Sequence, residues 1–335
     1  ATEINMPMLT IIGNGWEDYS DYINKVVMDI TAEDSHIDFA TIGYFAPQIA
    51  HWKTQLSNVE LHGRGTVADM EGRVEHVELA EQTTAALDFR MVGLPEVERT
   101  RFTFDIERLS TNIDDAMAVM TDLTGRALPS KLQTMLARAE QINLTGEFDG
   151  RLKAFNAEAV LSTALGALDG RMVMANGGAK GRSSFTGDVA TTNFDLAGLL
   201  EMKKLGRVSL AANLDGEMGG GQFRANVDGR VPLLDFNDYR YDSISLRGKI
   251  DNRRFAGVVG SDDHNLDFDF NGEVDFNGEV PRYDFALDLD RADLHALNFN
   301  QRDSLSVLGA RIKANGSGNS IDNLNGTVVI NEAEY

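Results

Sequence analysis

Cysteine is absent from this chain of 335 residues, and tryptophan and proline are scarce, with 2 and 6 copies. Without cysteine the chain can form no disulfide, no thiolate metal site and no cysteine nucleophile. Long apolar runs are also missing, so we expect neither a membrane-spanning helix nor a signal peptide within these residues. Ala1 is not a natural start, and a strand pattern at 328–330 lies close to the other end, so we expect a fragment of a longer protein.

Basic residues are outnumbered, because 31 Lys and Arg stand against 52 Asp and Glu and give a net charge of −21. Binding of nucleic acid needs a basic surface that neutralises phosphates, so we expect no nucleic acid partner. The same charge argues against electrostatic docking on an anionic membrane leaflet. Since 42% of the residues are hydrophobic, the chain is expected to fold rather than to remain a disordered acidic segment.

The dominant pattern in the chain is alternation of apolar and polar residues. Phe102, Phe104 and Ile106 are separated by polar residues, and the same period occurs at 210–214, 223–227, 266–270 and 283–289. A period of two predicts antiparallel strands with one apolar and one polar face. Dipeptides typical of hairpin turns punctuate the pattern: Asp149-Gly150, Asp169-Gly170, Asp215-Gly216, Asp228-Gly229, Asn271-Gly272, Asn277-Gly278 and Asn325-Gly326. The sequence therefore predicts a mainly β fold.

Helical patterns are few and short. Apolar residues at helical spacing predict helices over 112–123 and 130–142, and shorter candidates lie at 39–47, 194–203 and 294–298. Four of these segments share an aspartate beside an apolar residue near their start, at Asp38, Asp114, Asp195 and Asp293. This recurrence suggests a degenerate repeat of several strands and one short helix, although glycine-rich strand ends occur in any β protein.

Such short helices cannot cover the apolar face of a large sheet, and this face must be buried or used. A sandwich, a closed barrel and a sheet curled around an apolar groove all remain possible. Only the groove predicts an apolar ligand, and we expect its lining to come from the alternating strands. The candidate lipid-binding residues are Phe102, Phe104, Ile106, Phe223, Val227, Ile244, Leu246, Phe268, Phe270, Phe285, Leu287 and Leu289.

The motifs of common catalytic and metal sites are missing or incomplete. Neither a His-Glu-x-x-His nor a Gly-x-Ser-x-Gly motif occurs, and Lys180-Gly181 is in the wrong order for a phosphate-binding loop. Residues 267–272 match the first half of a calcium loop, but Gly278 stands where the bidentate carboxylate should be. We therefore expect no catalytic residues, no metal site and no cofactor, and we predict that the protein is not an enzyme.

Several segments resemble the AsmA-like family, in particular the TamB group of the translocation and assembly module. The resemblance lies in the element at 194–200, which stands between hairpins, and in the strand segments at 208–216 and 241–248. Residues 35–67 look like a further copy. The acidic composition, rich in Asn-Gly and Asp-Gly, is similar to that of Bacteroidetes members.

The resemblance implies a long curled antiparallel sheet with an apolar β-groove and a few short helices. It implies groove repeats over 1–142, with helices near 112–142, and further groove repeats over 143–335. The family is periplasmic, with an inner-membrane anchor expected upstream of these residues. The resemblance further implies that phospholipid or another amphiphile is guided along the groove in outer-membrane biogenesis or in protein translocation and assembly. An outer-membrane β-barrel assembly protein would then be a partner through regions outside this chain.

Two alternatives from other classes remain. A structural or adhesive β-sandwich of the cell envelope would have two sheets that cover each other. A carbohydrate-active enzyme would need a carboxylate pair in a cleft with exposed aromatic residues, for which Trp16 and Trp52 are the only tryptophans.

Overall fold

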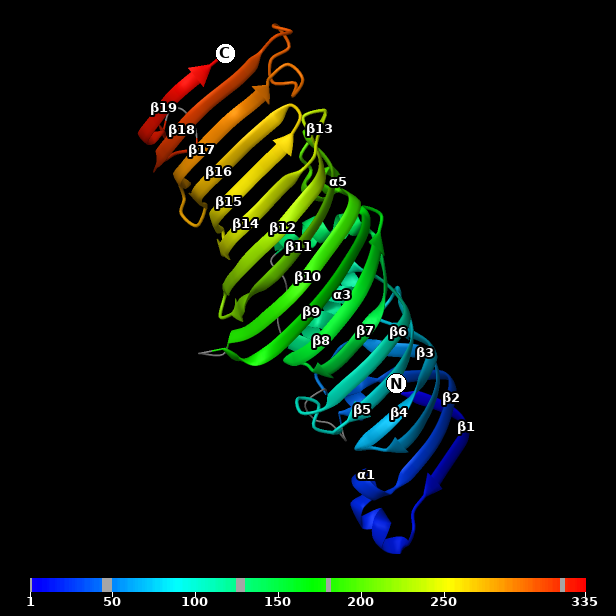
Figure 1. Cartoon of the computed structure of the whole chain (residues 1–335). Helices are drawn as coiled ribbons and strands as arrows, with labels where there is room; N and C mark the ends of the chain where they lie inside the picture. Colours follow the sequence, from blue (N-terminus) through cyan, green and yellow to red (C-terminus); the bar gives the residue numbers. More distant parts are fainter. Residues whose placement is uncertain (1, 44–49, 125–129, 179–181, 320–322) are drawn as a thin grey trace. The chain divides into compact units, whose positions relative to one another are not determined.

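The protein is an open antiparallel β-sheet, which confirms the predicted fold class. The computed structural model describes all residues except 1, 44–49, 125–129, 179–181 and 320–322. Nineteen strands belong to one sheet, and a few short helices accompany them (Figure 1). The chain divides into two compact units, 1–165 and 166–335. The boundary expected from the sequence, between residues 142 and 143, stays a prediction.

In the first unit, eight strands pair in chain order, each antiparallel to the next. They are β1 (Glu3–Ile12), β2 (Val27–Asp38), β3 (Gln55–Thr66), β4 (Asp69–Leu79), β5 (Thr83–Val92), β6 (Arg101–Asn112), β7 (Gln141–Arg151) and β8 (Ala154–Thr163). The helical segments are η1 (Trp16–Asp21), α1 (Tyr22–Lys25), α2 (Phe39–Ile42), α3 (Ile113–Thr124), α4 (Ser130–Leu136) and η3 (Ala137–Ala139).

In the second unit, the strands again follow the chain order, and β12 pairs with both β13 and β14. They are β9 (Gly166–Gly178), β10 (Arg182–Asp195), β11 (Leu205–Gly219), β12 (Gln222–Phe236), β13 (Tyr239–Tyr241), β14 (Ile244–Asp251), β15 (Arg254–Asp263), β16 (Leu266–Asp275), β17 (Arg282–Asp293), β18 (Val307–Ser317) and β19 (Asn325–Glu334). One helix, α5 (Leu196–Leu200), lies between β10 and β11.

Most of the Asn-Gly and Asp-Gly dipeptides lie inside strands, where the sequence predicts turns. Asp149-Gly150 belongs to β7, Asp215-Gly216 to β11 and Asn271-Gly272 to β16, whereas Asn277-Gly278 does lie between two strands. Glycine within a strand marks a place where two backbones approach closely. The hairpin assignment was therefore wrong at the dipeptides that lie inside strands. At Gly150, Gly216 and Gly272 a side chain would collide with the backbone of the neighbouring strand.

Several close backbone approaches form a row across the second unit. The strand register places Gly248, Gly257 and Gly272 side by side, followed by Phe285. A Cβ atom on Gly257 would lie 2.3 Å from the Arg247 carbonyl oxygen, which no real side chain tolerates. The first unit repeats the arrangement, since Gly63 and Gly72 lie beside Phe89.

Two of the four aspartates singled out in the sequence cap short helices at the ends of strands. Asp38 accepts a hydrogen bond from the Ala40 backbone N–H at 2.9 Å, and Asp195 accepts one from Gly198 at the same distance. Asp293 accepts one from Ala296, but 294–298 forms a turn instead of the predicted helix. At α3 the cap is Asn112 rather than Asp114, because the Asn112 side chain accepts from the Asp115 backbone N–H.

The predicted helices over 112–123 and 130–142 are present as α3 and as α4 with η3, although β7 begins at Gln141. The carboxylate of Asp122, in α3, accepts hydrogen bonds from the Lys53 backbone N–H and from the backbone N–H and hydroxyl of Thr54, at 2.6–2.9 Å. Partial burial alone would raise the pKa of Asp122, but the hydrogen bonds from Thr54 and Lys53 outweigh it and hold that pKa below its ordinary value. Asp122 therefore ties α3 to the segment that precedes β3.

We expect Gly257→Ala to lower the free energy of unfolding by about 1–3 kcal/mol, because the added methyl group collides with the neighbouring backbone. Gly170→Ala, in β9, is the matched control, since the nearest atom to its Cβ position is 3.6 Å away. Urea denaturation, monitored by circular dichroism, measures the free energy of unfolding of both variants. Equal midpoints for the two variants would show that the close approach at Gly257 is not required.

The lowered pKa of Asp122 predicts that this residue contributes to the loss of folding stability in acid. Its pKa is lower in the folded than in the unfolded state, so its stabilisation is present above the unfolded pKa of about 3.9 and is lost as the pH falls through the folded pKa. Thermal melts between pH 7 and pH 2 should therefore show a shallower acid decline for Asp122→Asn than for the parent. Asp114→Asn, an exposed change in the same helix, is the matched control; a parallel change in both variants would contradict the assignment.

Candidate functional site

One face of the sheet in each unit is apolar, and all twelve residues expected from the alternation lie on it. Val227 and Leu289 are buried, with 6% and 8% of their surface exposed, and the other ten are half-buried. Ten of the twelve side chains are therefore only partly covered.

In the first unit, aromatic rings from three strands form a continuous band. The ring centroids of Phe102 and Phe104 are 5.7 Å apart, those of Phe104 and Phe148 6.0 Å, and those of Phe148 and Phe155 5.0 Å. Ile106 lies on the same face, in register with Leu87. The candidate residues did not include Phe148 and Phe155, although both lie within strands that alternate in the same way.

In the second unit, the apolar face contains an open hollow of about 510 Å³. Eight apolar residues line it, and four of them were expected: Phe268, Phe270, Leu287 and Leu289. The other four are Phe255, Val259, Leu266 and Val274. A volume of this size is typical of a site for a small organic ligand.

A second apolar hollow of about 450 Å³ lies over β17 to β19. Phe285, Tyr283 and Val328 are among its lining residues. The rings of Phe270 and Phe285 are 5.2 Å apart, so this pair lies where the two hollows adjoin on β16 and β17.

The remaining expected residues lie on the same face, outside the two hollows. Phe223 stacks on Phe185 at 5.5 Å. Val227 is in register with Gly248, and Leu246 with Val259. Ile244 packs against the core cluster that Tyr241, Leu289, Ala292 and Leu297 form.

This core cluster occupies the rim of the second unit at which β17 ends. Leu297 is 1% exposed, and Leu266 and Phe268 pack against the cluster from the side of the hollow. Buried Asp263 fixes the rim, since it accepts hydrogen bonds from the Tyr239 hydroxyl at 2.8 Å and from the Asp242 backbone N–H at 3.0 Å. Burial, together with the bond to Asp263, raises the pKa of Tyr239. The core cluster thus borders the hollow at this end.

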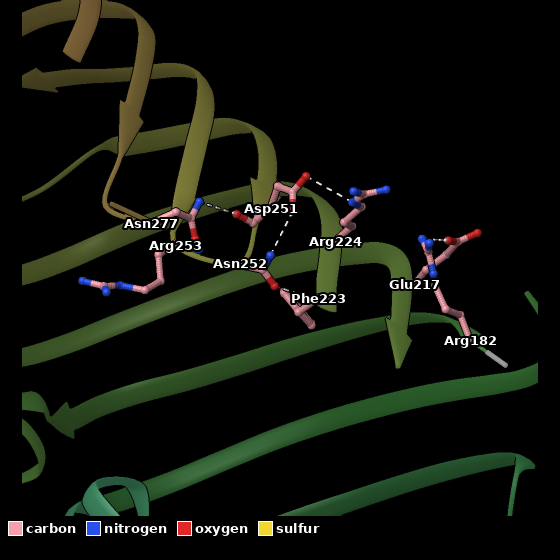
Figure 2. Close-up of polar contacts among 8 residues, drawn as sticks. All are labelled: Arg182, Glu217, Phe223, Arg224, Asp251, Asn252, Arg253 and Asn277. Atoms are coloured by element: carbon pink, nitrogen blue, oxygen red, sulfur yellow. Dashed lines mark hydrogen bonds and ion pairs between the residues drawn. The ribbon is translucent and has the colours of Figure 1, made fainter. Parts of the chain in front are cut away.

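Hydrogen bonds between turns fix the opposite rim (Figure 2). The Asn252 backbone N–H donates to the Phe223 carbonyl at 2.8 Å, and the Phe223 N–H donates to the Asn252 side chain at 2.9 Å. The Arg253 N–H donates to the Asn277 side chain at 3.2 Å, and the Phe276 N–H donates to the Arg253 carbonyl at 3.0 Å. The ends of β12, β14 and β16 are therefore held together.

The polar face of the sheet carries cross-strand ion pairs. Arg247 lies 2.9 Å from Asp228, and Arg224 lies 3.1 Å from Asp251. Hydrogen bonding and charge attraction between Arg101 and Asp149 raise the pKa of Arg101 and lower the pKa of Asp149. These groups are largely exposed, so each pair contributes little stability. Their main effect is to keep this face in water and to leave the apolar face for other contacts.

The structure offers little for metal chemistry. Within the described residues, no three His, Asp or Glu side chains gather in a way that would hold a metal ion. The acidic segment that resembles half of a calcium loop is part of β16, where Asp267 and Asp269 are paired with Arg291 and Asp288 of β17. Its oxygen atoms therefore extend along a strand instead of converging on one point. The described helices include none that is long and apolar enough to span a bilayer.

We therefore predict that calcium has no effect on folding. Addition of millimolar calcium chloride should leave the melting temperature within error of that in chelator, both for the parent and for Asp269→Ala. A calcium-dependent rise in the parent that disappears in Asp269→Ala would contradict this, because ligand binding to the folded state alone must stabilise it.

Comparison with known proteins identifies no relative of this chain. No family model matches the sequence, no curated protein matches it, and no solved structure matches its fold.

Proposed function

We propose that this chain is a periplasmic part of an AsmA/TamB-like bridge between the two membranes of a Gram-negative cell. It guides phospholipids along the apolar face of the sheet, in outer-membrane biogenesis or in protein translocation and assembly. The observation that carries the proposal is the open hollow lined by Phe255, Phe268, Phe270, Leu287 and other apolar residues. Neither a helix nor a second sheet among the described residues of this unit covers it.

The mechanism is passive and needs no catalytic group. Acyl chains lie against the apolar face, while the polar headgroup remains in water. Each buried methylene contributes about 0.8 kcal/mol, so a chain of many methylenes is held without a specific tight site. Because the apolar face continues from strand to strand, a bound chain can move between neighbouring positions.

A structural or adhesive β-sandwich remains the alternative from another class. Its stability would depend on a second sheet packed over the residues that line the hollow. The described residues form one open sheet, and no second sheet among them packs over the hollow. An outer-membrane barrel partner belongs to the proposal only through regions outside this chain.

The test is lipid binding by the purified protein. Native mass spectrometry of protein purified from bacteria should show bound phospholipid or detergent, and a fluorescent fatty acid should be taken up. Protein that stays free of lipid and takes up no fluorescent fatty acid would overturn the proposal.

Leu287→Arg should separate an open groove from a sealed core. Leu287 lines the hollow and is half-buried, so a long arginine there can reach water and the protein should stay folded. Uptake of the fluorescent fatty acid should fall at least about tenfold, because the charge interrupts the apolar surface. Between two packed sheets the same unpaired charge would cost about 3–5 kcal/mol and unfold the domain.

Ala286→Arg is the matched control, since Ala286 is the neighbour of Leu287 on β17 and therefore points to the opposite face of the sheet. It is in register with Asn271 and Lys313 on the polar face. This variant should melt with the parent and bind lipid normally. An equal loss of uptake in both variants would show that the apolar face is not the binding surface.

A further inference from the structure

The hollow over β15 to β17 has two different ends, and this difference has a consequence for the orientation of its ligand. At one end, Leu289 belongs to the core cluster and Leu266 packs against it. Leu297, in the same cluster, is only 1% exposed. At the other end, Phe255 and Val274 are paired in register beside the turns of the opposite rim. We therefore expect an amphiphile in the hollow to place its apolar end toward the core cluster and its headgroup toward the turns.

The turn between β14 and β15 brings Arg253 to this second end, two residues before Phe255. The backbone of Arg253 is held on both sides, since its N–H donates to Asn277 and its carbonyl accepts from Phe276. Phe276 is itself 43% exposed, so apolar surface continues onto the turn. The position of Arg253 is thus fixed before any ligand arrives.

The guanidinium of Arg253 has no ion-pair or hydrogen-bond partner among the described residues, and Figure 2 shows it directed away from the neighbouring contacts. The two nearby arginines, by contrast, form ion pairs, Arg224 with Asp251 and Arg254 with Glu273. In a chain with a net charge of −21, an anion needs such a local cation. A guanidinium fork binds phosphate oxygens in a bidentate manner.

We propose that Arg253 binds the phosphate of a phospholipid headgroup whose acyl chain occupies the hollow. This inference rests on the proposed function and adds to it the headgroup chemistry and the orientation of the lipid. The apolar lining holds the chain with its methyl end toward Leu289, and Arg253 selects lipids that carry a phosphate over neutral lipids with the same chain.

The experiment compares three probes on the whole chain by isothermal titration or fluorescence competition. Lysophosphatidic acid carries one acyl chain and a phosphate, monoacylglycerol carries the same chain without phosphate, and glycerol 3-phosphate carries the phosphate without a chain. The parent should bind lysophosphatidic acid about fivefold to tenfold more tightly than monoacylglycerol, as expected for one charge-assisted contact. Glycerol 3-phosphate should not compete; competition at equal concentration would assign the site to free phosphate and overturn the lipid proposal.

Three variants test the residue and the orientation. Arg253→Gln should remove the preference for lysophosphatidic acid and leave monoacylglycerol binding unchanged, whereas Arg253→Lys should keep part of it. Arg302→Gln is the control at the rim of the core cluster, where the Arg302 side chain also lacks a partner in the described part of the chain. If Arg302→Gln removes the preference and Arg253→Gln does not, the proposed orientation is wrong.

The outcomes separate this inference from the proposed function. If the parent binds neither lipid, the proposed function fails and the headgroup site fails with it. If the parent binds both lipids equally, or if Arg253→Gln keeps the preference, lipid binding stands and the role of Arg253 is overturned. Thermal melts of all variants establish folding, which the exposed position of Arg253 and its backbone hydrogen bonds should preserve.

Discussion

The hydrogen-bonded ladder between neighbouring strands is the interaction on which this structure depends. The main core cluster of the second unit has only four buried residues, Tyr241, Leu289, Ala292 and Leu297, and it lies at a rim rather than under the sheet. Between the rims, adjacent backbones approach so closely that glycine is required at positions such as Gly257 and Gly272. A sheet held in this way by its backbone can leave an apolar face incompletely covered, which a protein stabilised mainly by a central core cannot do.

Charge supports the same division between the two faces. Arginines on the polar face are paired with carboxylates on neighbouring strands, as Arg247 is with Asp228 and Arg224 with Asp251. These exposed pairs add little stability, but they keep one face in water. The apolar face, with its hollows beside Phe270 and Phe285, is left for a ligand that is itself apolar.

The two rims of the second unit are built for different purposes. The loop that follows β17 packs into a small core, and the side chain of buried Asn237 fixes it by donating a hydrogen bond to the Leu297 carbonyl. The opposite rim consists of short turns, tied together through Asn252 and Asn277, and it leaves Arg253 without a side-chain partner among the described residues. The two ends of the strands in the second unit therefore differ in their chemistry.

The sequence by itself determined the fold class and the face on which each strand residue lies, because a period of two admits only one assignment for Phe268, Phe270, Leu287 and Leu289. It also located the capping aspartates at 38 and 195. It could not distinguish a glycine in a turn from one beside a neighbouring backbone, so Asn271-Gly272 was assigned to a hairpin; that distinction depends on the strand register. Tertiary structure alone brought Phe255 and Val274 to the hollow and placed Leu297 over one end of it, since these contacts join strands and loops through pairing that no local pattern encodes. The same register decided that Arg253 stands at the open end.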